Sequence, residues 1–534
     1  MTCAAVALVI SVAFAACIAA TTFTLAVERP IAVVPTSYLS TTMDIAVVVN
    51  HDHCNLTDPK LISMARQLPY SYIRVGGTEA DFTYYDWAHD VPAFPYPTPP
   101  PEFRKVLTKR MWDNVVDFVS SIGLKMFFGL NAGWGPGVRN NETHAWNASM
   151  AHMLLNYSAG KGWPIAGFEF SNEPNLYFMY PWKMNESRAA LLTGSQMAKD
   201  IVTVRQLIDG FSSEGWKLVC CDVAYVPVFG EFSSWVQDFA AGGGNQYVDY
   251  ATFHFYPLLA SAYNKTFPPA LDPFYAAPKK VLEPLVLDQV GYFADQFQKD
   301  LQTGGNLVPP IWLGETGSAV GGGQNGLSNR FADVIEYVDK IGQMTRRGQQ
   351  HLFRQTLCGS PDQYYALITH DITPTPTYFA TAILLTYILP SGRALEVKRT
   401  QKPKNMGLDE KLRVYAMCGN GSSIIVVAIN LDDSASRNMT VNAVPGSFDV
   451  TQSENTKQWM LTSTSLVGDT LIVNGNTMNV TDAGVIEPAL STLAVPAPQI
   501  LVSDSEIHLS DLPPVSVSFW EIPVVPGIVT ACQP

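Results

Sequence analysis

The segment GFEFSNEPN, residues 167–175, combines the pattern of a buried strand with an abrupt polar ending. Its apolar part stops at Ser171, and Asn172, Glu173 and Pro174 follow directly. A charged group at the end of a core strand must be solvated or paired, so it does not add stability by itself. The position of Glu173 therefore indicates a functional carboxylate.

Seven other short apolar runs occur along the chain, and helix-like segments such as MWDNVVDFVSSIG (111–123) separate them. Near-continuous apolar strands that alternate with helices predict a parallel sheet covered on both faces. Eight such strands over about 320 residues fit an α/β fold, the (β/α)8 TIM barrel. The expected strands are residues 44–50, 72–77, 125–131, 167–173, 217–223, 250–256, 311–315 and 351–357.

The texture of the sequence changes near residue 386. β-Rich runs divided by Gly, Asn and Ser replace the alternation with helices, which predicts an antiparallel β-sandwich. We therefore expect a catalytic barrel over 44–385 and a C-terminal β-sandwich domain over 386–534. The segment 22–43 precedes the first expected barrel strand, and we expect it to add a strand to the sandwich.

The first 21 residues are apolar with small residues near their end, as in a secretory signal peptide. No Lys or Arg precedes the apolar run, so a signal anchor is the alternative. Nine N-x-S/T glycosylation motifs favour export. We expect a secreted, extracellular or lysosomal protein with no membrane span after signal cleavage. The motifs begin at Asn55, Asn141, Asn147, Asn156, Asn185, Asn264, Asn420, Asn438 and Asn479.

The chain has 534 residues and a formal net charge of −13. This acidic balance argues against nucleic acid as a partner and against a broad basic surface for a densely sulfated polymer. The sequence has no CxxC or HExxH motif, so we expect no metal and no cofactor. The oligomeric state does not follow from the sequence.

Six cysteines remain once the expected signal peptide is removed. A disulfide between Cys418 and Cys532 would fasten the end of the chain to its own domain. The adjacent Cys220 and Cys221 lie in an apolar strand, KLVCCDVAY. We expect this pair to be small buried hydrophobic residues and not metal ligands.

The second important carboxylate is Glu315. Chemistry in a (β/α)8 barrel takes place at the C-terminal ends of the strands. With the expected strands, Glu173 ends the fourth and Glu315 ends the seventh, so both side chains can reach one substrate. Glycoside hydrolysis needs two such groups, one to protonate the leaving oxygen and one to attack or to direct water.

The segments around the two carboxylates are GFEFSNEPN and IWLGETGSAVGGG. They resemble glycoside hydrolase family 79, the heparanase-like endo-β-glucuronidases, to which leech hyaluronidase is related. The resemblance spans residues 44–534. It implies a retaining endo-β-glucuronidase that cleaves a glucuronic-acid-containing polysaccharide of the heparan sulfate or hyaluronan class. The motifs that carry it are GFEFSNEPN, IWLGETGSAVGGG, YIRVGGTEADF, FFGLNA, TFHFY, FRQ and KLRVYAMCGN.

The resemblance also implies a role for each matched residue. Glu173 would be the acid/base and Glu315 the nucleophile. The loop at Gly321 and Gly322 would receive the uronate carboxylate, because Gly lets the backbone approach closely and amide donors suit an anion. Other implied substrate contacts are Asn172 at the hydroxyl beside the reacting carbon, Tyr256 next to the nucleophile, and Gln355, Tyr365 and Thr78.

The chain departs from the family's pattern in three places. Val320 stands where the family's SAYGGG motif has Tyr, so one substrate-facing hydroxyl is lost. The stretches NETHAWNAS and AYVPVFGEF lack the Lys and Arg clusters that bind sulfate in heparanase. The segment excised from the heparanase precursor is missing between Tyr85 and Met111, so we expect an enzyme that acts as a single chain.

Structural roles without catalysis are an alternative for these residues. The two carboxylates could be structural, paired to Arg74 or Arg354 at the barrel mouth. His254 is expected to be a satisfied strand-end histidine and not a base. An exo-acting β-glucuronidase and a non-catalytic glycan-binding protein are the alternative functions.

Overall fold

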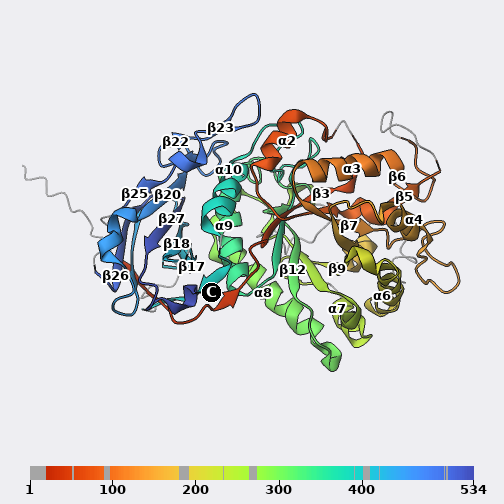
Figure 1. Ribbon diagram of the computed structural model, residues 1–534, viewed down its shortest axis with the longest axis horizontal. Helices are drawn as coiled ribbons and strands as arrows, with labels where there is room; N and C mark the ends of the chain where they lie inside the picture. The colour runs from red at the N-terminus through yellow and green to blue at the C-terminus, as the bar shows by residue number, and fades with distance from the viewer. Residues whose placement is uncertain are drawn as a thin grey trace, which may run out of the picture.

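A computed structural model (Figure 1) describes residues 20–50, 53–88, 97–179, 192–231, 234–263, 274–389, 391–400, 409–419, 421–497, 500 and 503–533. Residues 1–19 of the expected signal peptide lie outside these ranges, as do the glycosylation motifs at Asn185, Asn264 and Asn420. None of the helices in the described ranges has the length and apolarity needed to cross a bilayer.

Eight parallel strands close into a barrel, which confirms the predicted (β/α)8 fold. The strands follow one another around the barrel in chain order, and neighbours are paired in parallel throughout. Alternate side chains point inward and fill its base, where Phe127, Val219, Trp312 and Phe353 form a buried cluster. The strands are β3 (Leu39–Asp44), β4 (Tyr72–Gly76), β7 (Lys125–Leu130), β8 (Ile165–Phe170), β9 (Lys217–Tyr225), β10 (Tyr250–Phe255), β12 (Ile311–Thr316) and β14 (His351–Arg354).

The first barrel strand differs from the expectation. A strand at 44–50 is wrong, because β3 ends at Asp44 and residues 45–48 form the short helix α1. β3 pairs with β14 on one side and β4 on the other. Its Ser and Thr side chains are buried, and Thr41 Oγ1 donates to the backbone oxygen of Arg354 at 3.1 Å. The position of the first barrel strand therefore depends on pairing with β14 and β4, and the valine-rich run that follows Asp44 does not form it.

Helices surround the barrel, and some of them begin at a residue whose side chain caps the helix. The hydroxyl of Thr108 accepts from the N–H of Met111 at 3.3 Å at the start of α3, and Thr193 caps α6 in the same way. The helices are α1 (Ile45–Val48), α2 (Pro59–Arg66), α3 (Lys109–Ser121), α4 (Ser149–Ser158), α6 (Gly194–Asp209), α7 (Trp235–Ala241), α8 (Pro284–Leu301), α9 (Phe331–Arg346) and α10 (Pro376–Ile383).

Helix α9 lies between the barrel and the C-terminal strands (Figure 1). Its residues are buried on every side from Phe331 to Thr345. Tyr415 of the C-terminal sheet donates to Asp339 Oδ1 of this helix at 2.7 Å. The ring of Tyr415 also packs on Gly342, where an added Cβ would lie 2.5 Å from it. This close contact joins the two parts of the chain.

Most C-terminal strands of the described residues belong to two sheets, one of four strands and one of nine. Side chains from both sheets form one buried cluster, as in a β-sandwich. β1 lies in the smaller sheet between β16 and β19, so the N-terminal segment contributes a strand there. The boundaries at 385 and 386 stay predictions. The smaller sheet holds β16 (Val397–Arg399), β1 (Thr21–Leu25), β19 (Arg437–Asn442) and β26 (Glu506–Leu512). The larger holds β2 (Ala32–Val33), β15 (Arg393–Leu395), β17 (Leu412–Cys418), β18 (Ser423–Asn430), β27 (Ser516–Pro523), β20 (Lys457–Thr462), β21 (Ile472–Val473), β22 (Asn476–Thr477) and β25 (Val495–Pro496).

All six cysteines of the described residues are in disulfides. Cys418 and Cys532 are bonded with an S–S distance of 2.03 Å. Cys220 and Cys221 are buried as expected, and they are bonded to each other, a disulfide that was not predicted from the sequence. The third pair, Cys54–Cys358, was not anticipated.

Candidate active site

The carboxyl groups of Glu173 and Glu315 meet at one end of the barrel. Glu173 follows β8, and Glu315 is the penultimate residue of β12. One oxygen of each side chain and one ring nitrogen of His254 all lie within 4.8 Å of one another. The fold thus brings together two acidic residues that are 142 positions apart in the chain.

The backbone turns sharply where β8 ends. Ser171 has φ 79° and Glu173 has φ 48°, a left-handed conformation that costs a non-glycine residue about 1–3 kcal/mol. Asp222 on β9 adopts a similar conformation, with φ 53°. The N–H of Glu173 donates to the backbone oxygen of Asp222 at 2.9 Å and fixes the turn. Strained backbone of this kind is concentrated at functional sites.

Arg74 on β4 is the main counter-ion of the site. Its guanidinium donates to Glu315 at 2.6 Å, to Asp222 at 2.7 Å and also to Glu169. A fourth bond of 2.8 Å runs to Oδ1 of Asn172. Burial by itself would lower the pKa of Arg74, but the charges of Glu169, Asp222 and Glu315 raise it well above its ordinary value. Arg74 therefore stays cationic and holds the acidic cluster together.

Arg74→Met is expected to lower the free energy of unfolding by about 3–5 kcal/mol, because it leaves buried carboxylates without their counter-ion. Urea denaturation at neutral pH measures the change. The matched control is Arg29→Met, since Arg29 is exposed and its replacement should change stability by about 0.5 kcal/mol or less. Equal effects of the two variants would contradict this account of Arg74.

His254 on β10 lies among three carboxyl groups. Its Nδ1 is 3.2 Å from Glu173 Oε1 and 3.8 Å from Glu315 Oε2, and its Nε2 is 3.4 Å from Asp222 Oδ1. Burial would lower the pKa of His254, but the negative charges of Glu315 and Asp222 raise it to about 10. The ring is an imidazolium at neutral pH, so it pairs with the carboxylates and cannot serve as a base.

We expect the protein to lose stability as the pH rises above neutrality. The folded-state pKa of His254, about 10, exceeds the ordinary value of 6.5. Its ion pairs therefore stabilise fully below pH 6.5 and are lost as the pH rises through 10. One such proton gives a slope of at most about 1.4 kcal/mol per pH unit.

Urea unfolding of wild type and His254→Gln between neutral and alkaline pH measures this slope. The slope should flatten in His254→Gln and persist in the control His508→Gln, whose side chain is half exposed. A slope that survives unchanged in His254→Gln would show that other groups cause it.

Glu315 is held from two sides. The hydroxyl of Tyr256 donates to Oε1 at 2.6 Å, while Arg74 donates to Oε2. Burial and the negative charge of Glu315 raise the pKa of Tyr256 well above its ordinary value, so the phenol keeps its proton and remains a donor. These contacts orient the carboxylate toward the cavity described next.

A cavity of about 370 Å³ opens beside the two carboxyl groups. Asn172 does not line it, because its Oδ1 accepts from Arg74 and its N–H donates to Asp81 Oδ2 at 2.7 Å. All other substrate-site residues predicted from the sequence do line it. They are Thr78, Glu173, Tyr256, Glu315, Gly321, Gly322, Gln355 and Tyr365.

The cavity lining is acidic. Among the described residues it includes five carboxylic side chains and no Lys, Arg or His. The positive charges of Arg74 and His254 lie behind this lining and are already paired with carboxylates. An anionic group in the cavity must therefore be met by neutral hydrogen-bond donors. The five acids are Asp44, Glu79, Glu173, Glu315 and Asp362.

Sequence reasoning missed Asp44 and Gln363. Asp44 ends β3, and its carboxylate accepts from Gln355 Nε2 at 3.0 Å and from the amide of Gln363. Burial and the negative charge of Glu315 raise the pKa of Asp44 to about 6. The sequence signal that could have identified Asp44 as a site residue was its place as a carboxylate at the end of a strand. It was hidden because the first strand was expected to begin at Asp44.

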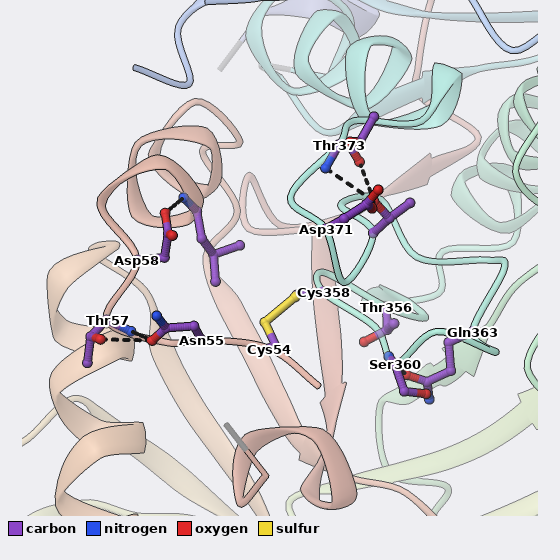
Figure 2. The surroundings of a disulfide bond; sticks show 12 residues. Cys54, Asn55, Thr57, Asp58, Thr356, Cys358, Ser360, Gln363, Asp371 and Thr373 are labelled. Atoms are coloured by element: carbon purple, nitrogen blue, oxygen red, sulfur yellow. Dashed lines mark hydrogen bonds between the residues drawn. A yellow bond between two sulfur atoms is a disulfide. The ribbon is translucent and has the colours of Figure 1, made fainter. Parts of the chain in front are cut away.

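A disulfide anchors the loop that forms one wall of the cavity, and Figure 2 shows the surroundings of this disulfide. Cys54 follows α1 and Cys358 follows β14, and their sulfur atoms are 2.11 Å apart. Ser360 and Gln363, in the loop after Cys358, line the cavity, and the N–H of Ser360 donates to Gln363 Oε1 at 2.8 Å. The disulfide therefore connects this loop to the first strand-to-helix segment of the barrel.

The structural alternative for the two carboxylates is correct in part. Glu315 pairs with Arg74, whereas Arg354 pairs with Asp333 at 2.6 Å. Glu173, His254 and Glu315 are also close enough to offer three ligand atoms to a metal ion. However, the protonated His254 and the guanidinium of Arg74 already supply positive charge there. Both glutamates still line the cavity, so pairing leaves them available for chemistry.

A (β/α)8 barrel with two carboxyl groups facing one cavity from its fourth and seventh strands defines a glycoside hydrolase. The match to known families agrees with this class. Residues 36–342 match the sequence family described as "Glycosyl hydrolase family 79, N-terminal domain". The chain belongs to this family.

The chain is similar to characterised relatives over most of its length. It is 27% identical to mouse heparanase over 436 residues, which cover 74% of each chain. It is 24% identical to the hyaluronoglucuronidase of Hirudo nipponia over 389 residues, or 69% of this chain and 71% of that one. A solved 4-O-α-L-rhamnosyl-β-D-glucuronidase from Fusarium oxysporum 12S has the same fold, with a TM-score of 0.59, 16% identity and coverage of 94% and 100%.

Proposed function

We propose that this protein is a secreted, retaining endo-β-glucuronidase. It cleaves internal glucuronide linkages of a glycosaminoglycan-type polysaccharide of the heparan sulfate or hyaluronan class. The observation that carries the proposal is that one oxygen of Glu173 and one oxygen of Glu315 lie within 4.8 Å of each other, while both residues line the cavity. Retaining glycosidases hold their two carboxyl groups about 5–5.5 Å apart, whereas inverting enzymes leave more room for a water molecule.

The proposed reaction has two steps. Glu173 donates its proton to the glycosidic oxygen while Glu315 attacks the anomeric carbon, so the C–O bond breaks and a glycosyl ester forms on Glu315. Water then attacks the same carbon, Glu173 takes a proton from it, and the ester bond to Glu315 breaks. The leaving oxygen departs with the proton of Glu173, and the attacking water returns a proton to Glu173. Two displacements at the same carbon retain the anomeric configuration.

The remaining cavity residues position the uronic acid in this proposal. Asn172 does not line the cavity, but Arg74 holds its Oδ1, so its amide nitrogen is the end that we propose donates to the hydroxyl beside the reacting carbon. The backbone at Gly321 and Gly322 meets the substrate carboxylate. Further contacts to sugar hydroxyls come from Thr78, Gln355, Tyr365 and the newly recognised Asp44.

Secretion is supported by the glycosylation motifs. Within the described part of the chain, Asn141, Asn147, Asn156 and Asn479 are exposed and can accept a glycan. Expression in a glycosylating host should give secreted protein whose mass falls on treatment with a glycan-removing amidase. Protein retained in the cytosol with an unmodified mass would contradict this part of the proposal.

Product analysis on glucuronic-acid polymers tests the proposed activity. The protein is incubated with hyaluronan, unsulfated heparosan and heparan sulfate, and chain length and new reducing ends are followed together. An endo enzyme shortens long chains early in the reaction. Release of monosaccharide alone would favour an exo-β-glucuronidase, and binding without new reducing ends would favour a non-catalytic glycan-binding protein.

Sulfation is expected to weaken and not to strengthen substrate use. Five acidic side chains and no basic ones line the described cavity, so added sulfate groups meet repulsion. kcat/KM on unsulfated heparosan should therefore equal or exceed that on heparan sulfate of similar length. Retention on heparin should also vary little with salt. Strong heparin binding that salt abolishes steeply would contradict this expectation.

A further inference from the structure

The glycine loop of the cavity is joined to a second segment that the sequence did not single out. Strand β11 (Leu258–Leu259) pairs in parallel with β13 (Ala319–Val320). After β11 the chain forms a short turn that ends at Tyr263, and the N–H of Ser261 donates to Gln324 Oε1 at 2.9 Å. Tyr263 is thus fixed in place beside residues 320–323.

The ring of Tyr263 lies directly on Gly321. An added Cβ at Gly321 would lie 2.2 Å from a ring carbon of Tyr263, a distance that real side chains do not allow. Gly321 also has φ +84°, a conformation that favours glycine. The glycine is therefore required by two independent features, its backbone conformation and the neighbouring ring.

Tyr263 is one of three tyrosines in the cavity lining, together with Tyr256 and Tyr365. The hydroxyl of Tyr256 donates to Glu315, whereas that of Tyr365 accepts from Gln355 Nε2 at 3.3 Å. Tyr263 is the tyrosine of this set that contacts Gly321. Burial and the negative charge of Glu173 raise the pKa of Tyr263 to about 12, so its hydroxyl keeps a proton to donate.

The chemistry of the cavity calls for such a donor. Because the described lining has no cationic side chain, a substrate carboxylate at the glycine loop depends on neutral N–H and O–H groups. Val320, at the start of this loop, lines the cavity but has no hydroxyl. A tyrosine hydroxyl brought by a neighbouring strand can supply what Val320 does not.

We propose that Tyr263 determines specificity for a uronate: its hydroxyl donates to the substrate carboxylate that sits at Gly321 and Gly322. This inference rests on the proposed function, because it assigns a recognition role within the same cavity. Tyr263 selects the charged sugar over its neutral counterpart and takes no part in bond breaking.

Binding to a protein that cannot turn over the ligand tests the hydroxyl. In a Glu315→Gln background, calorimetry gives the Kd of 4-nitrophenyl β-D-glucuronide and of its methyl ester. Adding Tyr263→Phe should raise the Kd of the glucuronide about tenfold, since a hydrogen bond to a charged group is lost. The Kd of the neutral ester should change less than about twofold. The control Tyr292→Phe, at an exposed ring of α8, should change neither.

An unchanged preference for the glucuronide in Tyr263→Phe would overturn the inference. Failure of the proposed function is recognised separately, because it appears as wild-type protein that binds glucuronides but never hydrolyses them. Wild-type hydrolysis combined with an unaltered Tyr263→Phe variant would reject the role of Tyr263 alone.

A second test uses the contact between Tyr263 and Gly321. Gly321→Ala should weaken glucuronide binding more than Gly326→Ala, because both sites have positive φ but only Gly321 faces a ring. In a Tyr263→Ala background the extra effect of Gly321→Ala should largely disappear, since the clash is gone. Additive effects of the two substitutions would contradict the contact on which the inference depends.

Discussion

Glu315→Gln is expected to reduce kcat by about 10⁴-fold or more, because a neutral amide at this position cannot attack the anomeric carbon to form the glycosyl ester. Glutamine has nearly the same shape: its one amide oxygen can accept from Arg74, and its NH2 group can donate to the hydroxyl oxygen of Tyr256, the two groups that lie 2.6 Å from the oxygens of Glu315. Folding should therefore survive. Initial rates on an aryl β-glucuronide, with circular dichroism spectra of both proteins, provide the measurement.

The matched control is Glu283→Gln, an exposed carboxylate that pairs with Lys280 at 3.0 Å on the barrel surface. Its activity should stay within about twofold of wild type, as expected for surface substitutions. Near-wild-type turnover in a folded Glu315→Gln protein would show that Glu315 is not the nucleophile.

Glu173→Gln should slow hydrolysis of polysaccharide by about 10²–10⁴-fold, the usual contribution of a general acid. The loss should depend on the leaving group. A 2,4-dinitrophenyl glucuronide needs no proton to depart, so its bond should still break and the glycosyl ester should accumulate. Azide needs no general base to attack this ester, so added azide should speed turnover in the variant.

Stopped-flow release of dinitrophenolate and identification of the glycosyl azide follow these steps. Glu231→Gln serves as a control, because Glu231 is a buried acid outside the cavity whose pKa burial raises to about 8. If Glu173→Gln lost equal activity on activated and unactivated substrates, and azide had no effect, its assignment as acid/base would be wrong.

The sequence allowed much of the barrel to be predicted. Seven of the eight expected strands share at least four residues with observed ones, whereas the first shares only Asp44. The seven could be predicted because a strand buried on both faces is apolar along its whole length. The same rule located Glu173 and Glu315, since a carboxylate directly after such a strand interrupts the pattern. The glycine loop and Gln355 were located by resemblance, and the structure brings them to the same cavity.

Other parts of the site depend on three-dimensional proximity and gave no local signal. Arg74 sits within an apolar strand, and nothing in the sequence shows that it contacts four side chains. Cys54 and Cys358 are 304 positions apart and became neighbours only through closure of the barrel. Tyr263 lies far from Gly321 in the chain and reaches it through the pairing of β11 with β13.

The central claim is that Glu173 and Glu315 act on opposite sides of one glycosidic bond, with Glu315 forming the covalent intermediate. A 2-deoxy-2-fluoro-β-glucuronide with a dinitrophenyl leaving group tests it most directly, because fluorine slows the second step more than an activated first step. Intact-protein mass should rise by one fluoroglucuronyl group, and peptide mapping should place that group on Glu315. Consumption of the reagent without any label, or a label on another residue, would contradict the claim.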